Sequence, residues 1–191
     1  MRVKRHSIEL FFDEATEQVL QGERRRMRDA GLPSPLLHWG MRPHVSVLLG
    51  SDMHEDAPDA LAALASEFAP LPVTLSVLGS FPGPQGTVIL LPVATRALLE
   101  LHASVHARLG SFFADSDPHY MPDSWVPHCT QSIFLDEGEL EATLRHLRTM
   151  DLPVIGRITS IGIHASMVDP TSNDLGRIGA TEYPAVFALG G

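Results

Sequence analysis

Two kinds of hydrophobic pattern alternate along the chain. Short segments rich in β-branched and alternating apolar residues predict strands at residues 3–12, 43–50, 73–81, 87–93, 128–135, 154–167 and 183–189. Between them, apolar residues recur every three or four positions after Asp13, Pro58, Thr95 and Asp136, which are typical helix-starting residues. Because strands and helices alternate irregularly, with hairpins between some strands, the pattern favours an α+β fold over a doubly wound parallel sheet.

The second half of this pattern resembles the first, and no long polar linker interrupts it. We therefore expect one domain over residues 1–191, built from two similar halves that share a core. The content of 44% hydrophobic and 19% charged residues is that of a globular protein. We interpret the basic run at residues 23–26 as a solvated helix face.

Charge and cysteine content narrow the possible partners. A formal net charge of −9 disfavours binding to a long nucleic acid, although a small nucleotide or an RNA end needs only local donors. Cys129 is the only cysteine, so neither an intrachain disulfide nor a zinc finger is expected. No apolar run reaches the roughly 20 residues of a membrane helix, and the N-terminus has no signal-peptide pattern. We expect a cytoplasmic monomer.

One short motif occurs twice, once in each half of the chain. Pro43-His44-Val45-Ser46 and Pro127-His128-Cys129-Thr130 share the pattern Pro-His-x-[Ser/Thr], and each lies at the start of a predicted strand. Side chains alternate along a strand, so each histidine should share a face with the hydroxyl two residues later. By the same alternation, Ser132 should join this face, and Gln131 and Ile133 should lie opposite. A pseudo-twofold relation between the halves would bring both polar faces to one cleft.

Two histidines facing one phosphate can catalyse transfer at phosphorus. Histidine accepts and donates protons near neutral pH, so His44 and His128 can serve as base and acid on the attacking and leaving oxygens. Ser46 and Thr130 can donate hydrogen bonds to the non-bridging oxygens, where charge must be stabilised. This arrangement predicts a phosphoesterase that requires no metal and no cofactor.

Other histidines in the chain offer alternatives. His102-Ala103-Ser104 and His164-Ala165-Ser166 lack the proline, and we interpret both as structural, although the strand of His164 could border the cleft. His102 and His106 have the helical spacing of two metal ligands, which would indicate a metalloenzyme. No third ligand is evident, so a solvated helix face is the favoured interpretation.

The duplicated motif resembles that of the two-histidine (2H) phosphoesterase superfamily, and in particular its 2'-5' RNA ligase-like and cyclic phosphodiesterase branch. The segment Leu78-Gly79-Ser80-Phe81 fits a glycine-bearing strand of that family. The resemblance implies a bilobed fold of two pseudo-symmetric antiparallel sheets, with helices outside and a cleft between the sheets. It also implies hydrolysis of 2',3'-type cyclic phosphates, and in some members cleavage or joining of 2'-5' linkages.

The resemblance makes His44 and His128 the catalytic pair, and Ser46 and Thr130 the phosphate-binding hydroxyls. Gln131 departs from the family pattern, in which an apolar residue usually follows the hydroxyl, and we expect only a packing adjustment.

Residues near the motifs are candidates for contact with the rest of a substrate. Phe81 and Trp125 could stack on a base, and Tyr120 and His119 could form a flap over the cleft. Arg42 is interpreted as a solvated strand end. A non-catalytic protein that binds a nucleotide or RNA end in the same cleft remains the alternative function.

Overall fold

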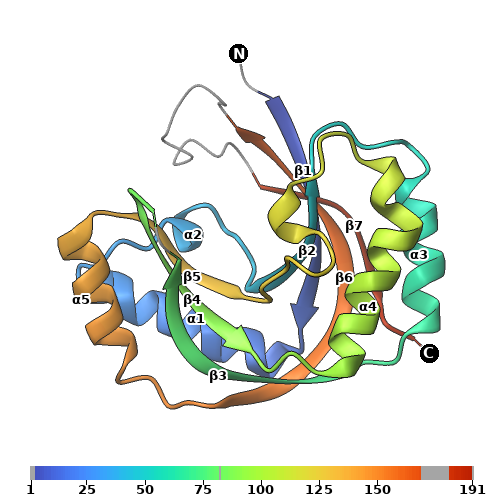
Figure 1. Ribbon diagram of the computed structural model, residues 1–191. Helices are drawn as coiled ribbons and strands as arrows, with labels where there is room; N and C mark the ends of the chain where they lie inside the picture. The colour runs from blue at the N-terminus through green and yellow to red at the C-terminus, as the bar shows by residue number, and fades with distance from the viewer. Residues whose placement is uncertain (1–2, 82, 169–180, 191) are drawn as a thin grey trace.

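The computed structural model describes residues 3–81, 83–168 and 181–190 (Figure 1). Its strands are β1 (Val3–Phe12), β2 (His44–Gly50), β3 (Leu71–Phe81), β4 (Gly86–Pro92), β5 (Cys129–Leu135), β6 (Val154–Val168) and β7 (Glu182–Ala188). Its helices are α1 (Glu14–Asp29), α2 (Pro35–His38), α3 (Ala57–Glu67), α4 (Arg96–Leu109) and α5 (Glu137–Leu147), with short 3-10 turns η1 (Gly110–Phe112) and η2 (Pro118–Tyr120).

The strands form one antiparallel sheet of seven strands, which confirms the α+β class. The order is β2-β1-β6-β3-β4-β5, β7 pairs with β6, and the sheet is not closed. The chain runs twice through the same element order, β1-α1-β2-α3-β3 and then β4-α4-β5-α5-β6. The third strand of each repeat pairs into the other half, since β3 pairs with β4 and β6 pairs with β1. The two expected sheets are therefore the two arms of one curved sheet, joined where β3 meets β6.

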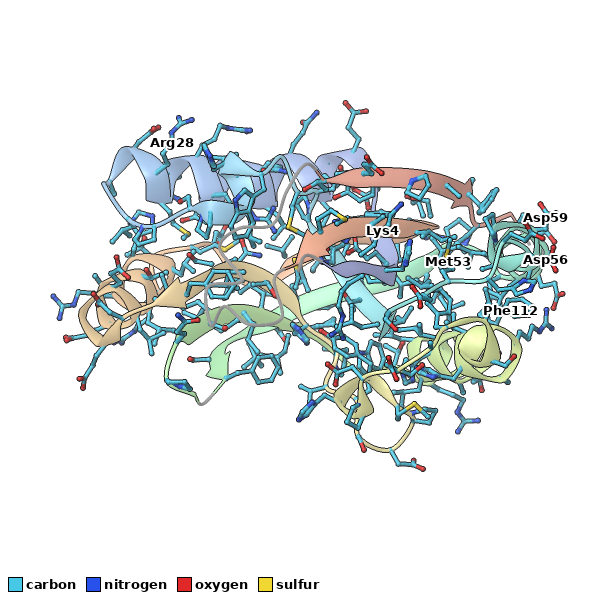
Figure 2. The ribbon with its side chains drawn as sticks, turned by 90° about the horizontal axis from the view of Figure 1, so that it is seen from above. Lys4, Arg28, Met53, Asp56, Asp59 and Phe112 are labelled. Atoms are coloured by element: carbon cyan, nitrogen blue, oxygen red, sulfur yellow. The ribbon has the colours of Figure 1, made fainter. Side chains whose placement is uncertain are left out.

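The helices lie in two groups at opposite arms of the sheet. Helices α1 and α5 pack together near β5 and β4, and α3 packs with α4 near β2 (Figures 1 and 2). The core consists of the apolar faces of the strands and helices, with Ile8, Leu10, Val45 and Leu90 among its fully buried members. None of the helices in the described ranges is long and apolar enough to span a bilayer.

Local sequence signals account for the helix starts. The Asp13 side chain accepts a hydrogen bond from the Thr16 backbone N–H at 2.8 Å and caps α1. Asp136 and Glu139 form the reciprocal bonds of a capping box at the start of α5. Helix α2 was not predicted, because four residues are too few to show a period.

A β-bulge follows the hydroxyl of each duplicated motif. Ser46 pairs with Glu9 of β1 and Leu48 with Ile8, so Val47 has no partner. In the same way Thr130 and Ser132 pair with consecutive residues of β4, which leaves Gln131 as the extra residue. A bulge reverses the alternation of side chains beyond it.

The bulge at Gln131 makes one sequence prediction wrong. Ser132 does not share the face of His128 and Thr130, because its hydroxyl is buried and donates to the Pro33 carbonyl at 2.7 Å. Ile133 instead lines the same cavity as Thr130. Gln131 itself is buried and hydrogen-bonds to Cys129.

Candidate active site

His44 and His128 are held by the same local hydrogen bond. The Nδ1 atom of His44 lies 2.8 Å from the Arg42 carbonyl oxygen, and Nδ1 of His128 lies 2.7 Å from the Val126 carbonyl oxygen. A carbonyl oxygen can only accept, so Nδ1 carries the proton in each ring. The Nε2 atom of each imidazole is therefore the position that gains or loses a proton, and the two halves repeat this arrangement.

Strands β2 and β5 are at opposite ends of the sheet order, yet they contact each other in space (Figure 1). The Arg24 guanidinium of α1 connects the segment before β2 to β5, donating to the Met41 carbonyl at 2.7 Å and to the Thr130 carbonyl at 2.8 Å. Burial lowers the pKa of His128, and the positive charge of protonated His44 lowers it further. Strands β2 and β5 therefore lie against each other, and the Arg24 side chain reaches both Thr130 and the segment before β2.

A cavity of about 510 Å³ opens beside His128. Its lining includes Thr130 and Phe81, and the Phe81 ring meets the His128 ring edge to face with centroids 4.8 Å apart. Tyr120 and His119, the two residues considered for a flap, also line the cavity. Burial raises the pKa of Tyr120 to about 12. The remaining lining residues are Thr87, Asp117, Ser124, Val126 and Ile133.

His44 and Ser46 are not part of the cavity lining. The side chain of His44 is 11% exposed, and burial lowers its pKa. Ser46 is half-buried on β2. The structure thus places His128, Thr130 and Phe81 around one cavity and His44 with Ser46 on the neighbouring strand that contacts β5.

Both motif strands are sheet edges, and side chains from other elements bind their free carbonyl groups. Trp125 Nε1 donates to the Ser46 carbonyl at 3.0 Å, and His106 Nε2 donates to the bulged Val47 carbonyl at 2.9 Å. Arg24 does the same for Thr130. An edge strand without such donors would leave polar groups unsatisfied wherever water is excluded.

Trp125 is placed by packing and lies outside the cavity lining. Its ring stacks on His102, with centroids 4.0 Å apart and planes 7° apart. This position gives no support to the prediction that Trp125 stacks on a substrate base. The predicted solvated face of α4 is also wrong, because His102 is buried and donates to the Tyr120 carbonyl at 2.8 Å. Within the described ranges, no cluster of three or more His, Cys, Asp or Glu side chains is arranged to hold a metal.

The basic run at residues 23–26 is likewise not a solvated face throughout. Arg24 is 1% exposed and Glu23 is also buried. The sequence carries a signal for this, because Arg24 falls between Leu20 and Met27 on the apolar stripe of α1. Burial lowers the pKa of the Arg24 guanidinium. Its hydrogen bonds to the Met41 and Thr130 carbonyls fix its position.

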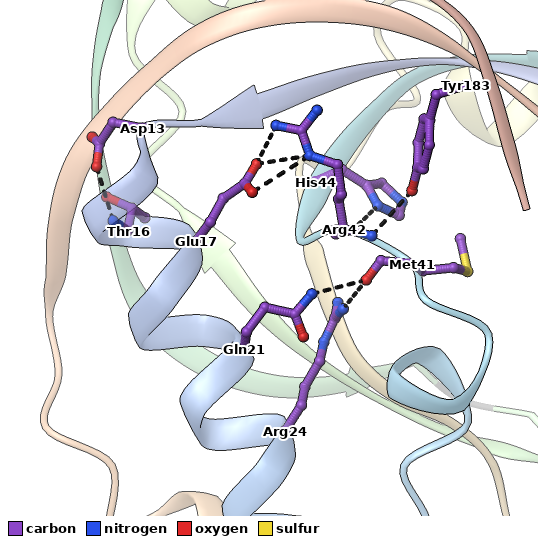
Figure 3. A network of polar contacts seen from close by, with 9 residues as sticks. All are labelled: Asp13, Thr16, Glu17, Gln21, Arg24, Met41, Arg42, His44 and Tyr183. Carbon is purple, nitrogen blue, oxygen red and sulfur yellow. Dashed lines mark hydrogen bonds and ion pairs between the residues drawn. The ribbon is translucent and has the colours of Figure 1, made fainter.

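The Arg42 side chain anchors the segment before His44 through contacts with Glu17, and these contacts do not favour a role in binding phosphate (Figure 3). Its guanidinium pairs with Glu17 at 2.5 Å and lies 4.2 Å from the centre of the Phe11 ring. Its backbone N–H donates to the Tyr183 hydroxyl at 3.0 Å. The interpretation of Arg42 as a solvated strand end is therefore corrected to a half-buried anchor.

Glu9 is the residue of the site that sequence analysis missed. It is 1% exposed on β1, beside Ser46 in the sheet register. Its Oε1 atom accepts from the Ser7 hydroxyl at 2.8 Å, lies 3.1 Å from His164 Nδ1 and lies 3.5 Å from His44 Nε2. His164 thus belongs to a buried polar cluster around Glu9 that borders His44, and it does not line the cavity beside His128.

Comparisons with known proteins agree with this architecture. A family model described as the 2'-5' RNA ligase superfamily matches residues 16–167. No curated protein matches the chain. Similar solved structures include Escherichia coli LigT in its apo form (TM-score 0.59, 15% identity, 100% of both chains) and complexed with 3'-AMP (TM-score 0.59, 15% identity, 99% of both chains).

The protein TT0787 of Thermus thermophilus is similar over 98% of both chains, with a TM-score of 0.60 and 17% identity. At these identities the solved structures show the fold alone. The family model, however, spans most of the sequence and includes both histidine motifs. The resemblance found in the sequence is therefore confirmed, and the chain belongs to the 2'-5' RNA ligase superfamily of 2H phosphoesterases.

Proposed function

We propose that this protein is a metal-independent phosphoesterase that opens a 2',3'-type cyclic phosphate on a nucleotide or an RNA end. His44 and His128 act as the acid–base pair, and Ser46 and Thr130 hold the phosphate. The observation that carries the proposal is the repeated hydrogen bond from each Nδ1 to a carbonyl oxygen, which leaves both Nε2 atoms for proton transfer.

The reaction needs one proton acceptor and one proton donor. A water molecule attacks phosphorus while one imidazole Nε2 accepts its proton. The bond from phosphorus to one ribose oxygen breaks, and the other imidazole Nε2 protonates that oxygen. The product is a ribose phosphomonoester with one free hydroxyl. Hydrogen bonds from Ser46 and Thr130 to the non-bridging oxygens stabilise the charge that develops there.

Two further features support a nucleotide substrate. Phe81 presents an aromatic ring in the same cavity as His128 and Thr130, where a base or sugar could pack. The similar structure of LigT has been solved with 3'-AMP, a nucleotide that carries a ribose phosphate.

Hydrolysis of 2',3'-cyclic AMP in the presence of EDTA tests the proposal. We expect turnover by the wild type and a loss of about 10²–10⁴-fold in His44→Gln and in His128→Gln, the range for removal of a general acid or base. His54→Gln is the matched control, because His54 lies on the exposed segment after β2.

Three outcomes would contradict the proposal. Substantial activity in either active-site variant removes the acid–base pair, and dependence on an added metal removes the metal-independent mechanism. Tight binding of the nucleotide without turnover by the wild type would favour the non-catalytic alternative.

A further inference from the structure

The two histidines differ at the atom that does the chemistry. Nε2 of His44 lies 3.5 Å from a carboxylate oxygen of Glu9. Within residues 3–81, 83–168 and 181–190, no ion pair joins His128 to a carboxylate. The pseudo-symmetry of the site is therefore broken by one buried charge on β1.

The surroundings of Glu9 keep it ionised. Burial raises the pKa of its carboxyl group, but the charges of His44 and His164 and the hydrogen bonds from His164 and Ser7 outweigh burial, so the pKa falls below its ordinary value. Its Oε2 atom is buried without a hydrogen-bond partner among the described residues. A buried carboxylate favours a nearby positive charge. The oxygen nearest to His44 is Oε1, which also accepts from Ser7 and lies beside His164.

His44 can supply that positive charge only in its protonated form. Its Nδ1 proton is donated to the Arg42 carbonyl, so neutral His44 has an unprotonated Nε2 that lies 3.5 Å from the Glu9 carboxylate. Protonation at Nε2 replaces this repulsion by an attraction between opposite charges 3.5 Å apart. Burial lowers the pKa of His44, and Glu9 opposes that effect.

Charged groups on other elements face the same cluster. Arg24 on α1 and His164 on β6 disfavour a proton on His44, and Tyr183 on β7 lies next to His164 with ring centroids 5.4 Å apart. Only Glu9 supplies a negative charge at His44 Nε2 among the described residues. Protonated His44 also lowers the pKa of His128.

We propose that Glu9 is a positioning residue that holds a proton on His44 Nε2, so that His44 is the general acid and His128 the general base. The assignment of acid and base roles rests on the proposed function, but the effect of Glu9 on the protonation of His44 does not. In the reaction, the His44 Nε2 proton passes to the leaving ribose oxygen, and the water proton passes to His128 Nε2. Exchange with solvent then restores the starting protonation states.

Titration of the histidine rings by NMR tests the hold of Glu9 without substrate. The signals of His44 and His128 are assigned from their absence in His44→Gln and His128→Gln. In the wild type, we expect His44 to keep its proton to higher pH than His128. In Glu9→Gln, which preserves side-chain volume and an acceptor for Ser7, we expect the pKa of His44 to fall by about one or more.

Glu17→Gln is the matched control, because Glu17 pairs with Arg42 near the same segment without touching His44 Nε2. It should leave the His44 titration unchanged. If Glu9→Gln does not fold, the order in which His44 and His128 titrate in the wild type still tests the proposal. It is overturned if His128 keeps its proton to higher pH than His44. An unchanged His44 titration in folded Glu9→Gln overturns it as well.

The pH dependence of kcat/KM tests the assignment of roles. Glu9→Gln should move the alkaline limb to lower pH and reduce kcat/KM at neutral pH by about tenfold, because the acid loses its proton earlier. Movement of the acidic limb instead would overturn His44 as the acid. If the wild type turns over no cyclic nucleotide, the proposed function fails while the substrate-free titration still tests the hold of Glu9.

Discussion

Substitution of Trp125 by Phe separates a structural role from a substrate-binding role. Phenylalanine keeps an aromatic ring for stacking on His102 and removes the N–H that donates to the Ser46 carbonyl at 3.0 Å. The lost hydrogen bond accounts for about 0.5–1.5 kcal/mol. With the smaller ring, we expect a total loss of roughly 1–2 kcal/mol in the free energy of unfolding.

Thermal unfolding and steady-state kinetics measure the two roles independently. For a chain of this size, the expected loss lowers Tm by about 2–8 °C. The KM for 2',3'-cyclic AMP should stay within about twofold, because Trp125 does not line the cavity. A KM raised about tenfold or more at unchanged Tm would refute this reasoning and return Trp125 to the substrate site.

Three other predictions concern the hydroxyl pair, Arg24 and His102. Ser46→Ala and Thr130→Val should each lower kcat/KM by about 10²–10³-fold with little change in Tm, whereas Thr130→Ser, which keeps the hydroxyl, should retain most activity. Arg24→Met leaves the Thr130 carbonyl without its side-chain donor and the Met41 carbonyl with Gln21 alone, so urea unfolding should show a loss of about 2 kcal/mol in the free energy of unfolding. Unchanged stability would contradict the bridging role. Burial holds the pKa of His102 below its unfolded value, so below about pH 6.5 the unfolded chain binds more protons than the folded chain. Stability should therefore fall as the pH drops through this range. His102→Gln should reduce the difference between the urea midpoints measured at pH 7.5 and at pH 5.5.

Local signals predicted most of the fold. The alternation and turn residues placed each described strand within a few residues of its observed bounds, and the caps at Asp13, Thr95 and Asp136 marked true helix starts. The repeated Pro-His-x-[Ser/Thr] motif predicted two equivalent strands, and the structure places them at the two edges of one sheet, where they contact each other.

Features that depend on tertiary pairing could not be predicted in this way. The bulge at Gln131 arises from the register between β5 and β4, so strict alternation exchanged Ser132 and Ile133. Trp125 was expected at the cavity because it lies in a loop, but its partners are 23 and 79 positions away in the sequence (His102 and Ser46).

Glu9 shows the same limit for electrostatics. In sequence it is one polar residue between Ile8 and Leu10 on a strand, a pattern that usually indicates a solvent-facing position. It lies on a strand flanked by β2 and β6, which bring His44 and His164 to it, and His164 is 155 residues away (164 minus 9). The partners that make this carboxylate significant come from the fold.

Titration with inorganic phosphate, followed through the ring signals of His44 and His128 by NMR, tests most directly whether both rings serve one phosphorus centre. A single anion bound between them should shift both signals along one saturation curve with one Kd, and Thr130→Val should weaken that Kd for both signals together. A response of only one ring, or two curves with different Kd values, would contradict the paired-histidine site.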